Sequence, residues 1–520
     1  MKQVFHCKGS TVDQRGARQT TVPFEDFYQI DGTKLKQFPI PEHRPEALAT
    51  RIDALAQELG TQGPAPTLFR WETNGEPLCA ALATSEATAA TLRGRMIALQ
   101  EELDWQCYRL YGLLAADDEL EWPEDQLDAL PELALGQRSF EILMARAMAA
   151  GELETTWFDR HAHAGSQAIT EIPADWPADY RALVERRMRC MAENKNINLI
   201  ERPEYKRRWN TEPWAKRQEA ALREWLLARL EAYFHDADRM IDGGADGDEE
   251  ARARQAAVLA KLAPARRAFP AGQGFALGTT RQLADAAALD PQWMEAAQVY
   301  TGNAAFDVPK LVRELVEKES VPYLPALRYK APGLRKRAQW ERTWELQREE
   351  DAVEAAVRRA HPDATEEQLK PLIREAQQAE VGDIPVPPKY KSSDFKKSSY
   401  WSLRGKLDVA KERWVIYPGA ERAADPSPVI AWAGWDHKQQ IAALGAYYYE
   451  RQSVDGWDEK RLLPLLAGMK DLISWVKQWH PGIDPEYGQD LGEFYANFVR
   501  TQCHDLGLTE TDVEQARIGE

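Results

Sequence analysis

Two stretches of the chain repeat apolar residues at alternating spacings of three and four, and this repeat constrains the fold most strongly. The repeats are Leu48, Ile52, Leu55 and Leu59 in the first stretch, and Leu92, Met96, Leu99, Leu103, Cys107, Leu110 and Leu114 in the second. Residues three and four apart share one face of an α-helix, so each stretch predicts a helix with a narrow apolar stripe. The segment from Gly60 to Glu76 is rich in Gly and Pro, so we expect it to connect the two helices. We expect a coiled-coil-like helical hairpin.

Helical patterns continue along the chain. Ala215 to Tyr233 carries an apolar face, and Trp340 to Ala360 is a charged helix with many pairs at spacing four. Between them, Thr280 to Leu289 and Val308 to Ser320 predict short helices, with a third around Gln292 to Val299. Three short helices in a row fit a helix-turn-helix, and equally a small helical subdomain that binds no DNA.

Short β elements are predicted near the C-terminus. Trp414 to Tyr417 reads as a strand, and Pro428 to Trp435 is expected to pair with it. Asp484-Pro485-Glu486 is expected to begin a helix, because Asp favours the cap and Pro the first turn. The predicted fold class is therefore mainly α with small β elements (α+β).

Composition excludes several classes of protein. With 520 residues, of which 44% are apolar, the chain is long enough for several folded domains and is not generally disordered. A formal net charge of −17 argues against nonspecific wrapping of DNA by the whole surface. The five cysteines are scattered without CxxC spacing, which indicates reduced thiols and no zinc site. No apolar run long enough to span a membrane and no signal peptide is visible, so we expect a cytoplasmic protein.

The two signs of charge are segregated along the sequence. Acidic residues concentrate in Asp117–Glu132 and Asp242–Glu250. Basic residues concentrate in Lys2–Arg18, Arg186–Arg217, Arg328–Arg342 and Lys389–Arg413. Such segregation indicates local basic faces that suit nucleic acid, although solubilising charge on helices explains each cluster equally well.

The stretch from Asp394 to Val409 interleaves cations with aromatic residues, and Arg413 to Glu421 follows it closely. This composition suits a partner that bears phosphates or carboxylates. We expect the cations to contact phosphates while the aromatics stack or pack. The alternative is that Tyr400, Trp401 and Leu403 enter a core and that Arg404 pairs with a buried carboxylate. The candidate DNA-binding residues are Lys8, Arg15, Arg18, Arg335, Lys336, Arg337, Lys396, Lys397, Tyr400, Trp401, Arg404 and Lys406.

Five motifs carry a resemblance to a known family. They are Thr33–Pro41, Glu101–Leu113, Ile200–Trp209, Trp340–Gln347 and the SYWSLRGKLDV run at Ser399–Val409. In this order, over nearly the whole chain, they resemble the C-terminal region of the PglX family, the adenine-specific DNA methyltransferases of type 2 BREX phage-defence systems. In that family the first motif corresponds to the exit from a target-recognition domain, and the second to the helix that follows it.

The catalytic motifs of such an enzyme are not found in this sequence. An amino-methyltransferase needs an Asn/Asp-Pro-Pro-aromatic motif to hold the flipped base. Here Pro387-Pro388 follows Val386 and precedes Lys389, which reads as a linker. For the methyl donor, the nearest Gly-rich candidate is Gly272 to Gly278, in an Ala/Pro-rich context. We expect no catalytic residue, metal or cofactor in this chain, which is then inactive alone. The resemblance implies S-adenosylmethionine for the full-length family enzyme.

These observations predict five segments and one function. The segments are the β-rich end of a target-recognition domain (1–45), a helical hairpin spacer (46–118), a helical subdomain (119–270), a basic helical subdomain (271–380) and a C-terminal α+β subdomain (381–520). The resemblance implies a DNA-recognition and assembly region of a site-specific adenine-N6 methyltransferase that marks host DNA as self. Its partners would be double-stranded DNA, the catalytic methyltransferase portion and other BREX proteins, with no membrane. The alternative is a protein-interaction scaffold that docks other BREX components without touching DNA.

Overall fold

The fold is seen in a computed structural model, which describes residue 32 and residues 36–115, 118–206, 209, 211–234, 260–269, 275–404 and 412–519. Two compact units divide the chain, Met1–Leu222 and Arg223–Glu520, with the boundary inside helix α9 (Trp214–Ala232). Most described residues are helical, and a small four-stranded sheet accompanies them, so the predicted fold class is confirmed. The finer division into five segments stays a prediction. Most of the first, residues 1–31 and 33–35, lies outside the described residues.

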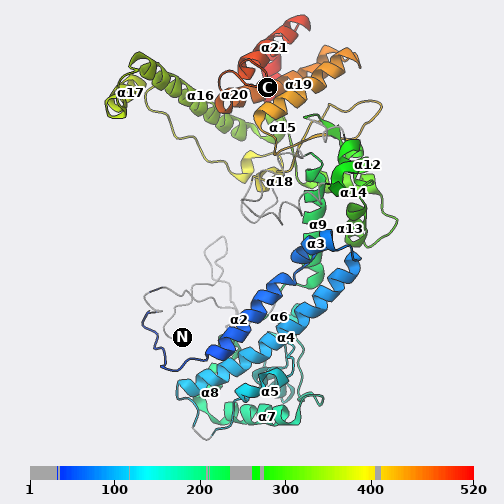
Figure 1. Cartoon of the computed structure of the whole chain (residues 1–520), viewed down its shortest axis with the longest axis vertical. Coiled ribbons are helices and arrows are strands. Elements are labelled where there is room, and N and C mark those ends of the chain that lie inside the picture. Colours follow the sequence, from blue (N-terminus) through cyan, green and yellow to red (C-terminus); the bar gives the residue numbers. More distant parts are fainter. Residues whose placement is uncertain are drawn as a thin grey trace. The chain divides into compact units, whose positions relative to one another are not determined.

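The first unit contains the expected helical hairpin. Helix α2 (Glu46–Thr61) lies beside α4 (Leu78–Leu110), as Figure 1 shows. The stripes form the contact, because Leu48, Ile52, Met96 and Leu99 share one buried cluster.

The connection within this hairpin contains a helix of its own, α3 (Pro64–Asn74). Pro64 occupies its first turn, where a missing N–H costs nothing. Leu68 and Trp71, each 2% exposed, form the buried face that holds the helix in place. The buried residues Pro64, Thr67, Leu68 and Trp71 share one face of this helix, although the surrounding Gly and Pro do not indicate a helix.

Shorter helices complete the first unit. They are η2 (Glu124–Ala129), α5 (Ser139–Ala149), α6 (Trp157–His161), η3 (Ala162–Ala164), α7 (Ala178–Glu193), α8 (Lys195–Ile200) and η4 (Pro203–Tyr205). A buried ion pair fastens α7 to α4: Arg187 donates from Nη1 and Nη2 to the two carboxylate oxygens of Glu102, at 2.8 and 2.5 Å. Such a bidentate pair fixes the register of the two helices as well as their contact.

The second unit contains the three expected short helices. These are α12 (Thr280–Ala287), α13 (Pro291–Thr301) and α14 (Val308–Lys318), so the helical predictions here are confirmed. Each begins with a side-chain cap, from Thr279, Asp290 and Asp307 respectively. Asp290 is also buried, and it accepts a hydrogen bond from Arg229 Nε at 2.7 Å, which joins α9 to this group.

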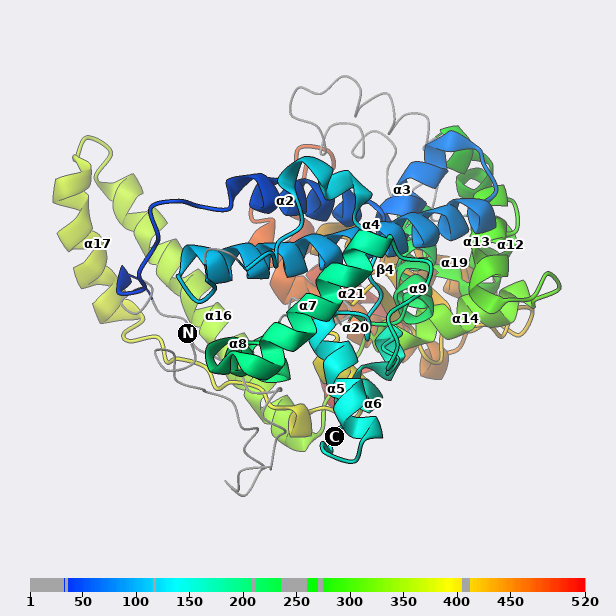
Figure 2. The same ribbon diagram turned by 90° about the horizontal axis from the view of Figure 1, so that it is seen from below.

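The remaining helices of the second unit begin after strand β2 (Ser320–Pro322). They are α15 (Pro325–Arg328), α16 (Ala331–Ala360), α17 (Glu366–Glu380), η6 (Ser392–Asp394), α18 (Ser398–Ser402), α19 (His437–Ser453), α20 (Glu459–Trp479), α21 (Leu491–Asp505) and α22 (Glu510–Ile518). Helices α16 and α17 lie side by side (Figure 2), while α20 contacts α19, α21 and α22. Helix α16 starts earlier than predicted, so its first three turns carry the cations at 335–337.

The four strands form one mixed sheet in the order β1-β4-β3-β2. The strands are β1 (Gly278–Thr279), β2 (Ser320–Pro322), β3 (Trp414–Ile416) and β4 (Val429–Trp432). The predicted pairing of the last two is confirmed: they run antiparallel with Trp414 opposite Trp432. Strand β2 pairs in parallel with β3, which brings the start of α16 to the edge of the sheet.

One predicted helix start is wrong. Asp484-Pro485-Glu486 forms a turn, and α21 begins only at Leu491 with Asp490 as its cap. The side chain of Asp484 accepts the backbone N–H groups of Glu486 and Tyr487 and also pairs with Lys438 Nζ at 2.8 Å. An Asp-Pro pair satisfies a tight turn as readily as a helix cap.

Candidate nucleic-acid interface

The segment Lys389–Arg404, here called the motif segment, lies along the start of α16. Tyr329 and Phe395 form an antiparallel β-bridge. Backbone hydrogen bonds extend the contact on both sides, from Lys330 N to Asp394 O at 2.8 Å and from Lys396 N to Arg328 O at 3.0 Å. Residues some 60 positions apart in the sequence, 328–336 and 389–396, therefore form one surface.

A glycine permits this close approach. A Cβ at Gly333, in the first turn of α16, would lie 2.3 Å from the carbonyl oxygen of Asp394. That distance is far below van der Waals contact, and the obstacle is backbone, which does not rotate away. The motif segment thus requires glycine at this one position of the helix.

A buried ion pair holds the same junction. Lys336 Nζ lies 2.7 Å from Asp394 Oδ2, and Asp394 is only 3% exposed. The backbone N–H of Lys391 donates to the same carboxylate at 2.6 Å. Burial disfavours the charged form of Asp394, but these hydrogen bonds outweigh it and hold its pKa below the usual value.

Aromatic residues of the motif segment form a small core of their own. Tyr400 and Leu403 are buried with Tyr329 and Phe395. Trp401 is half-buried, and its ring centroid lies 5.6 Å from that of Phe395. The alternative prediction, in which these side chains enter a core, describes this packing of Tyr400 and Leu403. The packing gives the segment a rigid base from which its cations project.

Arg404 does not pair with a carboxylate among the described residues. Its guanidinium carbon lies 4.5 Å from the centroid of the Tyr390 ring, and the residue is exposed. A guanidinium stacked on an aromatic face keeps its donors directed at solvent, where a phosphate can accept them.

The structure brings eight of the twelve candidate residues onto or beside this junction, and the other four lie outside the described residues. Those four are Lys8, Arg15, Arg18 and Lys406. Among the twelve, the exposed cations that form no ion pair with any described residue are Arg335, Lys396, Lys397 and Arg404. Lys336 and Arg337 are already paired with carboxylates, and Tyr400 and Trp401 are packed as above. Contact of any of the twelve with DNA stays a prediction.

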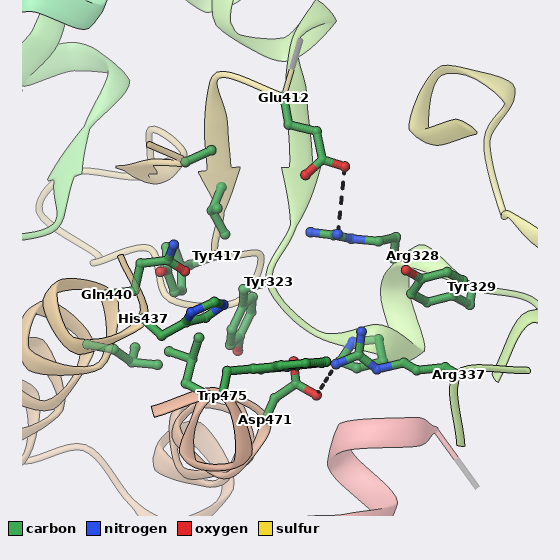
Figure 3. A pocket seen from close by; sticks show the side chains of 16 residues that line it. Tyr323, Arg328, Tyr329, Arg337, Glu412, Tyr417, His437, Gln440, Asp471 and Trp475 are labelled. Atoms are coloured by element: carbon green, nitrogen blue, oxygen red, sulfur yellow. Dashed lines mark hydrogen bonds and ion pairs between the residues drawn. The ribbon is translucent and has the colours of Figure 1, made fainter. Parts of the chain in front are cut away.

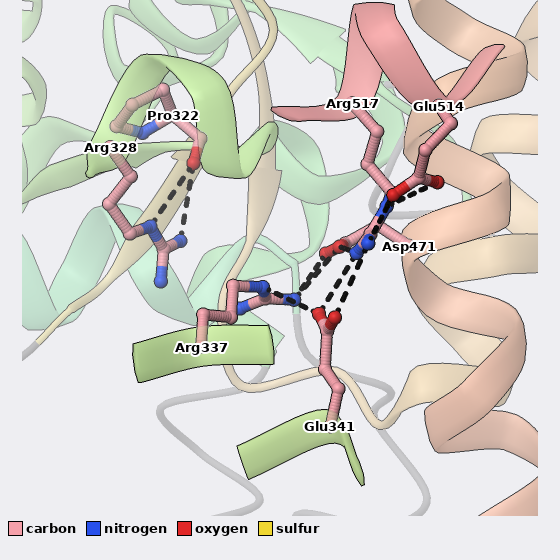
Figure 4. A network of polar contacts seen from close by, with 7 residues as sticks. All are labelled: Pro322, Arg328, Arg337, Glu341, Asp471, Glu514 and Arg517. Carbon is pink, nitrogen blue, oxygen red and sulfur yellow. Dashed lines mark hydrogen bonds and ion pairs between the residues drawn. The ribbon is translucent and has the colours of Figure 1, made fainter. Parts of the chain in front are cut away.

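Arg337 belongs to a network that joins α16, α20 and α22 (Figure 4). Its Nη2 donates to both carboxylate oxygens of Asp471, at 2.8 and 3.0 Å. Arg517 donates to Asp471 at 3.0 Å and to Glu341 at 2.9 Å. The charge of Arg337 is therefore balanced within the protein, and its pKa is raised because these carboxylates outweigh the effect of its burial.

A cavity of about 310 Å³ lies next to this junction, between the sheet, the start of α16 and helices α19 and α20. In Figure 3, Tyr323, Arg328, His437 and Trp475 surround its centre. The Tyr323 hydroxyl is buried and has no hydrogen-bond partner among the described residues. Burial, followed by the nearby His480, lowers the pKa of His437, which is therefore neutral near pH 7. The cavity offers aromatic faces and hydrogen-bond donors beside the motif segment.

Three further exposed cations, not singled out from the sequence, lie on the same two segments. They are Lys330, Lys389 and Lys391. Lys389 is tied to α16 because its carbonyl accepts a hydrogen bond from Lys336 Nζ at 3.1 Å. The sequence does indicate these three lysines, because all fall within the basic clusters 328–342 and 389–413. It does not show that the two clusters lie together in the fold.

The described residues do not fit a methyl-donor site. The site expected for a donor that carries a nucleoside lies at the carboxyl ends of a doubly wound parallel sheet, after a Gly-rich turn. Here the described strands are two to four residues long and mostly antiparallel. The candidate turn at 272–278 lies partly outside the described residues. Among the described residues, no group of His, Cys, Asp and Glu is arranged to hold a metal, and no helix has the length and apolarity to cross a bilayer.

Comparison with known proteins places these features in a family. The chain is 41% identical over 515 residues to the adenine-specific methyltransferase PglX of Streptomyces coelicolor, a match that covers 99% of this chain and 37% of that relative. The chain thus spans little more than a third of the length of PglX, and the expected resemblance is confirmed. No solved structure matches significantly. Residues 96–519 match the family model described as a domain of unknown function, DUF7008. This chain therefore belongs to the DUF7008 family.

Proposed function

We propose that this chain is the DNA-recognition and assembly region of a BREX-type, site-specific adenine-N6 DNA methyltransferase. It grips duplex DNA and positions a catalytic portion that carries S-adenosylmethionine. Methylation by the whole enzyme would mark host DNA as self during phage defence, in the cytoplasm. The likeness to a PglX methyltransferase supports the reaction class.

The observation that carries the DNA contact is a group of exposed cations with no carboxylate partner among the described residues. Arg335 projects from α16, and Lys396, Lys397 and Arg404 project from the motif segment that is bonded to it. These cations make the junction locally positive in a protein whose net charge is −17, and a locally positive face attracts anions. Phosphates, with their fixed spacing along a duplex, are such anions.

Charge reversal tests this proposal directly. The variant carries Lys396→Glu, Lys397→Glu and Arg404→Glu, and its binding to a labelled duplex is measured by fluorescence anisotropy. A matched control reverses three exposed cations of α14, namely Lys310, Arg313 and Lys318. Both variants change the net charge equally, so a loss confined to the first assigns the contact to the motif segment. Equal loss in both, or loss only in the control, would overturn the assignment.

A protein-docking role is the second candidate, and one feature favours it. The first unit has an apolar pocket edged by carboxylates, lined by residues of α5, α7 and α8. That feature suits a peptide better than a nucleic acid. In a scaffold, the charge-reversal variant above would keep its binding to partner proteins, and the unmodified chain would not bind DNA at low salt.

A further inference from the structure

A cavity in the first unit has a volume of about 830 Å³ and lies between α5, the loop after it, and the segment from α8 to η4. Its floor is apolar, formed by Phe140, Leu143, Met144 and Met191. Two of these side chains are methionines, which adapt their shape to different partners. Leu153 at the rim is 39% exposed, so the apolar surface continues outward from the cavity.

The charged residues that line this cavity are mostly acidic. Glu154, Glu201 and Glu204 line it, with Arg202 as the one cation among the lining residues. Glu201 is 5% exposed. Its Oε2, like Oε2 of Glu204, is buried and accepts no hydrogen bond from any described residue. A buried carboxylate oxygen without a donor is costly, and a side chain that lines a cavity can turn such an oxygen toward a donor that arrives with a ligand.

Lys206, which pairs with Glu201, cannot supply that donor. Lys206 Nζ already lies 2.7 Å from Asp104 Oδ2, 2.7 Å from Glu201 Oε1 and 3.4 Å from the Tyr108 hydroxyl. An ammonium group has three protons, and all three are used. Burial disfavours the charge, but Asp104 and Glu201 outweigh it and hold the pKa of Lys206 well above its usual value. The cluster of Asp104, Glu201 and Lys206 thus keeps one net negative charge.

We propose that this cavity binds an arginine side chain from an apolar segment of a partner protein. The guanidinium would donate to Glu201 and Glu204 at once, because its planar fork reaches two acceptors. Its methylene groups and an apolar neighbour would cover the methionines and Leu153. An anion such as nucleic acid is disfavoured here, since three of the four charged lining residues are acidic. This inference uses only residues of the first unit, so its test is independent of the test of the DNA proposal.

The test uses this chain and short fluorescent peptides with a central arginine between randomised apolar residues. Three matched peptide sets carry lysine, neutral citrulline or glutamate at the centre. We expect arginine peptides to bind, and citrulline to weaken binding about tenfold or more because the charge-assisted bonds are lost. Glu204→Gln should weaken the arginine peptides similarly, whereas Glu58→Gln, an exposed carboxylate on α2, should not.

A second variant separates binding from folding. Ala147→Trp fills the cavity from α5 without altering a charge, and it should abolish binding while the melting temperature stays near that of the parent. The proposal is overturned if no arginine peptide binds at about 1 mM, if citrulline peptides bind as well as arginine peptides, or if Ala147→Trp binds normally.

Discussion

Lys336 Nζ lies 2.7 Å from Asp394 Oδ2 and so fastens the motif segment to the first turns of α16. Asp394 is 3% exposed, and the same carboxylate accepts the N–H of Lys391. One buried side chain therefore organises both segments that carry the unpaired cations. If the Asp394 carboxylate holds the two segments together, then its removal should disorder them without removing any of those cations.

Asp394→Asn should lower the free energy of unfolding by about 1–3 kcal/mol, because Lys336 is left with an uncompensated, partly buried charge. Amide hydrogen exchange should speed up over 389–404 in particular. Thermal melting and exchange mass spectrometry measure the two effects. Lys397→Gln, at an exposed and unpaired position, is the control and should change neither. An unchanged exchange pattern in Asp394→Asn would contradict the role given to this pair.

The same pair predicts a pH dependence. The pKa of Asp394 in the folded chain is held below its ordinary value of 3.8, so folding favours the carboxylate. Its stabilising effect is complete above about pH 4 to 5 and is lost as the pH falls through the folded pKa. The stability difference between the parent and Asp394→Asn should therefore shrink below about pH 4. Denaturant titrations at a series of pH values measure it, and a difference that grows on acidification would have the wrong sign.

Gly333→Ala probes the junction without touching a charge. The new Cβ would meet the carbonyl oxygen of Asp394 at 2.3 Å, so the motif segment must move away from α16. We expect a destabilisation of about 1–3 kcal/mol, as for other forced overpacking, and weaker DNA binding. Ala338→Ser, on the exposed side of the same helix, is the control. Normal stability and normal DNA binding in Gly333→Ala would show that the close approach is dispensable.

Sequence patterns predicted what local periodicity determines. The apolar stripes gave α2 and α4, the run Trp414–Tyr417 gave β3, and segregated charge indicated the two basic clusters. Contacts between distant segments could not be predicted in this way. Nothing near Gly333 indicates that a backbone 60 residues later will pass over it. Local patterns also misled where a residue pair suits two structures, as at Asp484-Pro485, which forms a turn and not the predicted helix start.

The cavity in the first unit was missed for the same reason. Its walls come from α5, the end of α7 and the segment 198–204, which no single pattern joins. The run Ile200–Trp209 was noted for its resemblance and its charge, but not for Glu201, whose significance comes from its pairing with Lys206. A buried carboxylate looks like any other Glu until its surroundings are known.

The buried pair of Arg187 and Glu102 predicts a strong effect in the first unit. Arg187→Met leaves the Glu102 carboxylate buried without its partner, and should cost about 3–5 kcal/mol. The double variant with Glu102→Leu removes both charges and should recover a large part of that loss. Chemical denaturation of the parent, both single variants and the double variant measures the coupling. Equal stability of Arg187→Met and the double variant would mean that the buried charge matters little.

Equilibrium binding of this chain to a labelled duplex at several salt concentrations tests the DNA-facing account most directly. Each phosphate contacted contributes about −0.9 to the slope of log K against log salt, so four unpaired cations predict a slope of roughly −3 to −4. Arg404→Gln should make that slope shallower by about one contact. Binding that does not depend on salt, or no binding even at low salt, would contradict the account and favour a protein-docking scaffold.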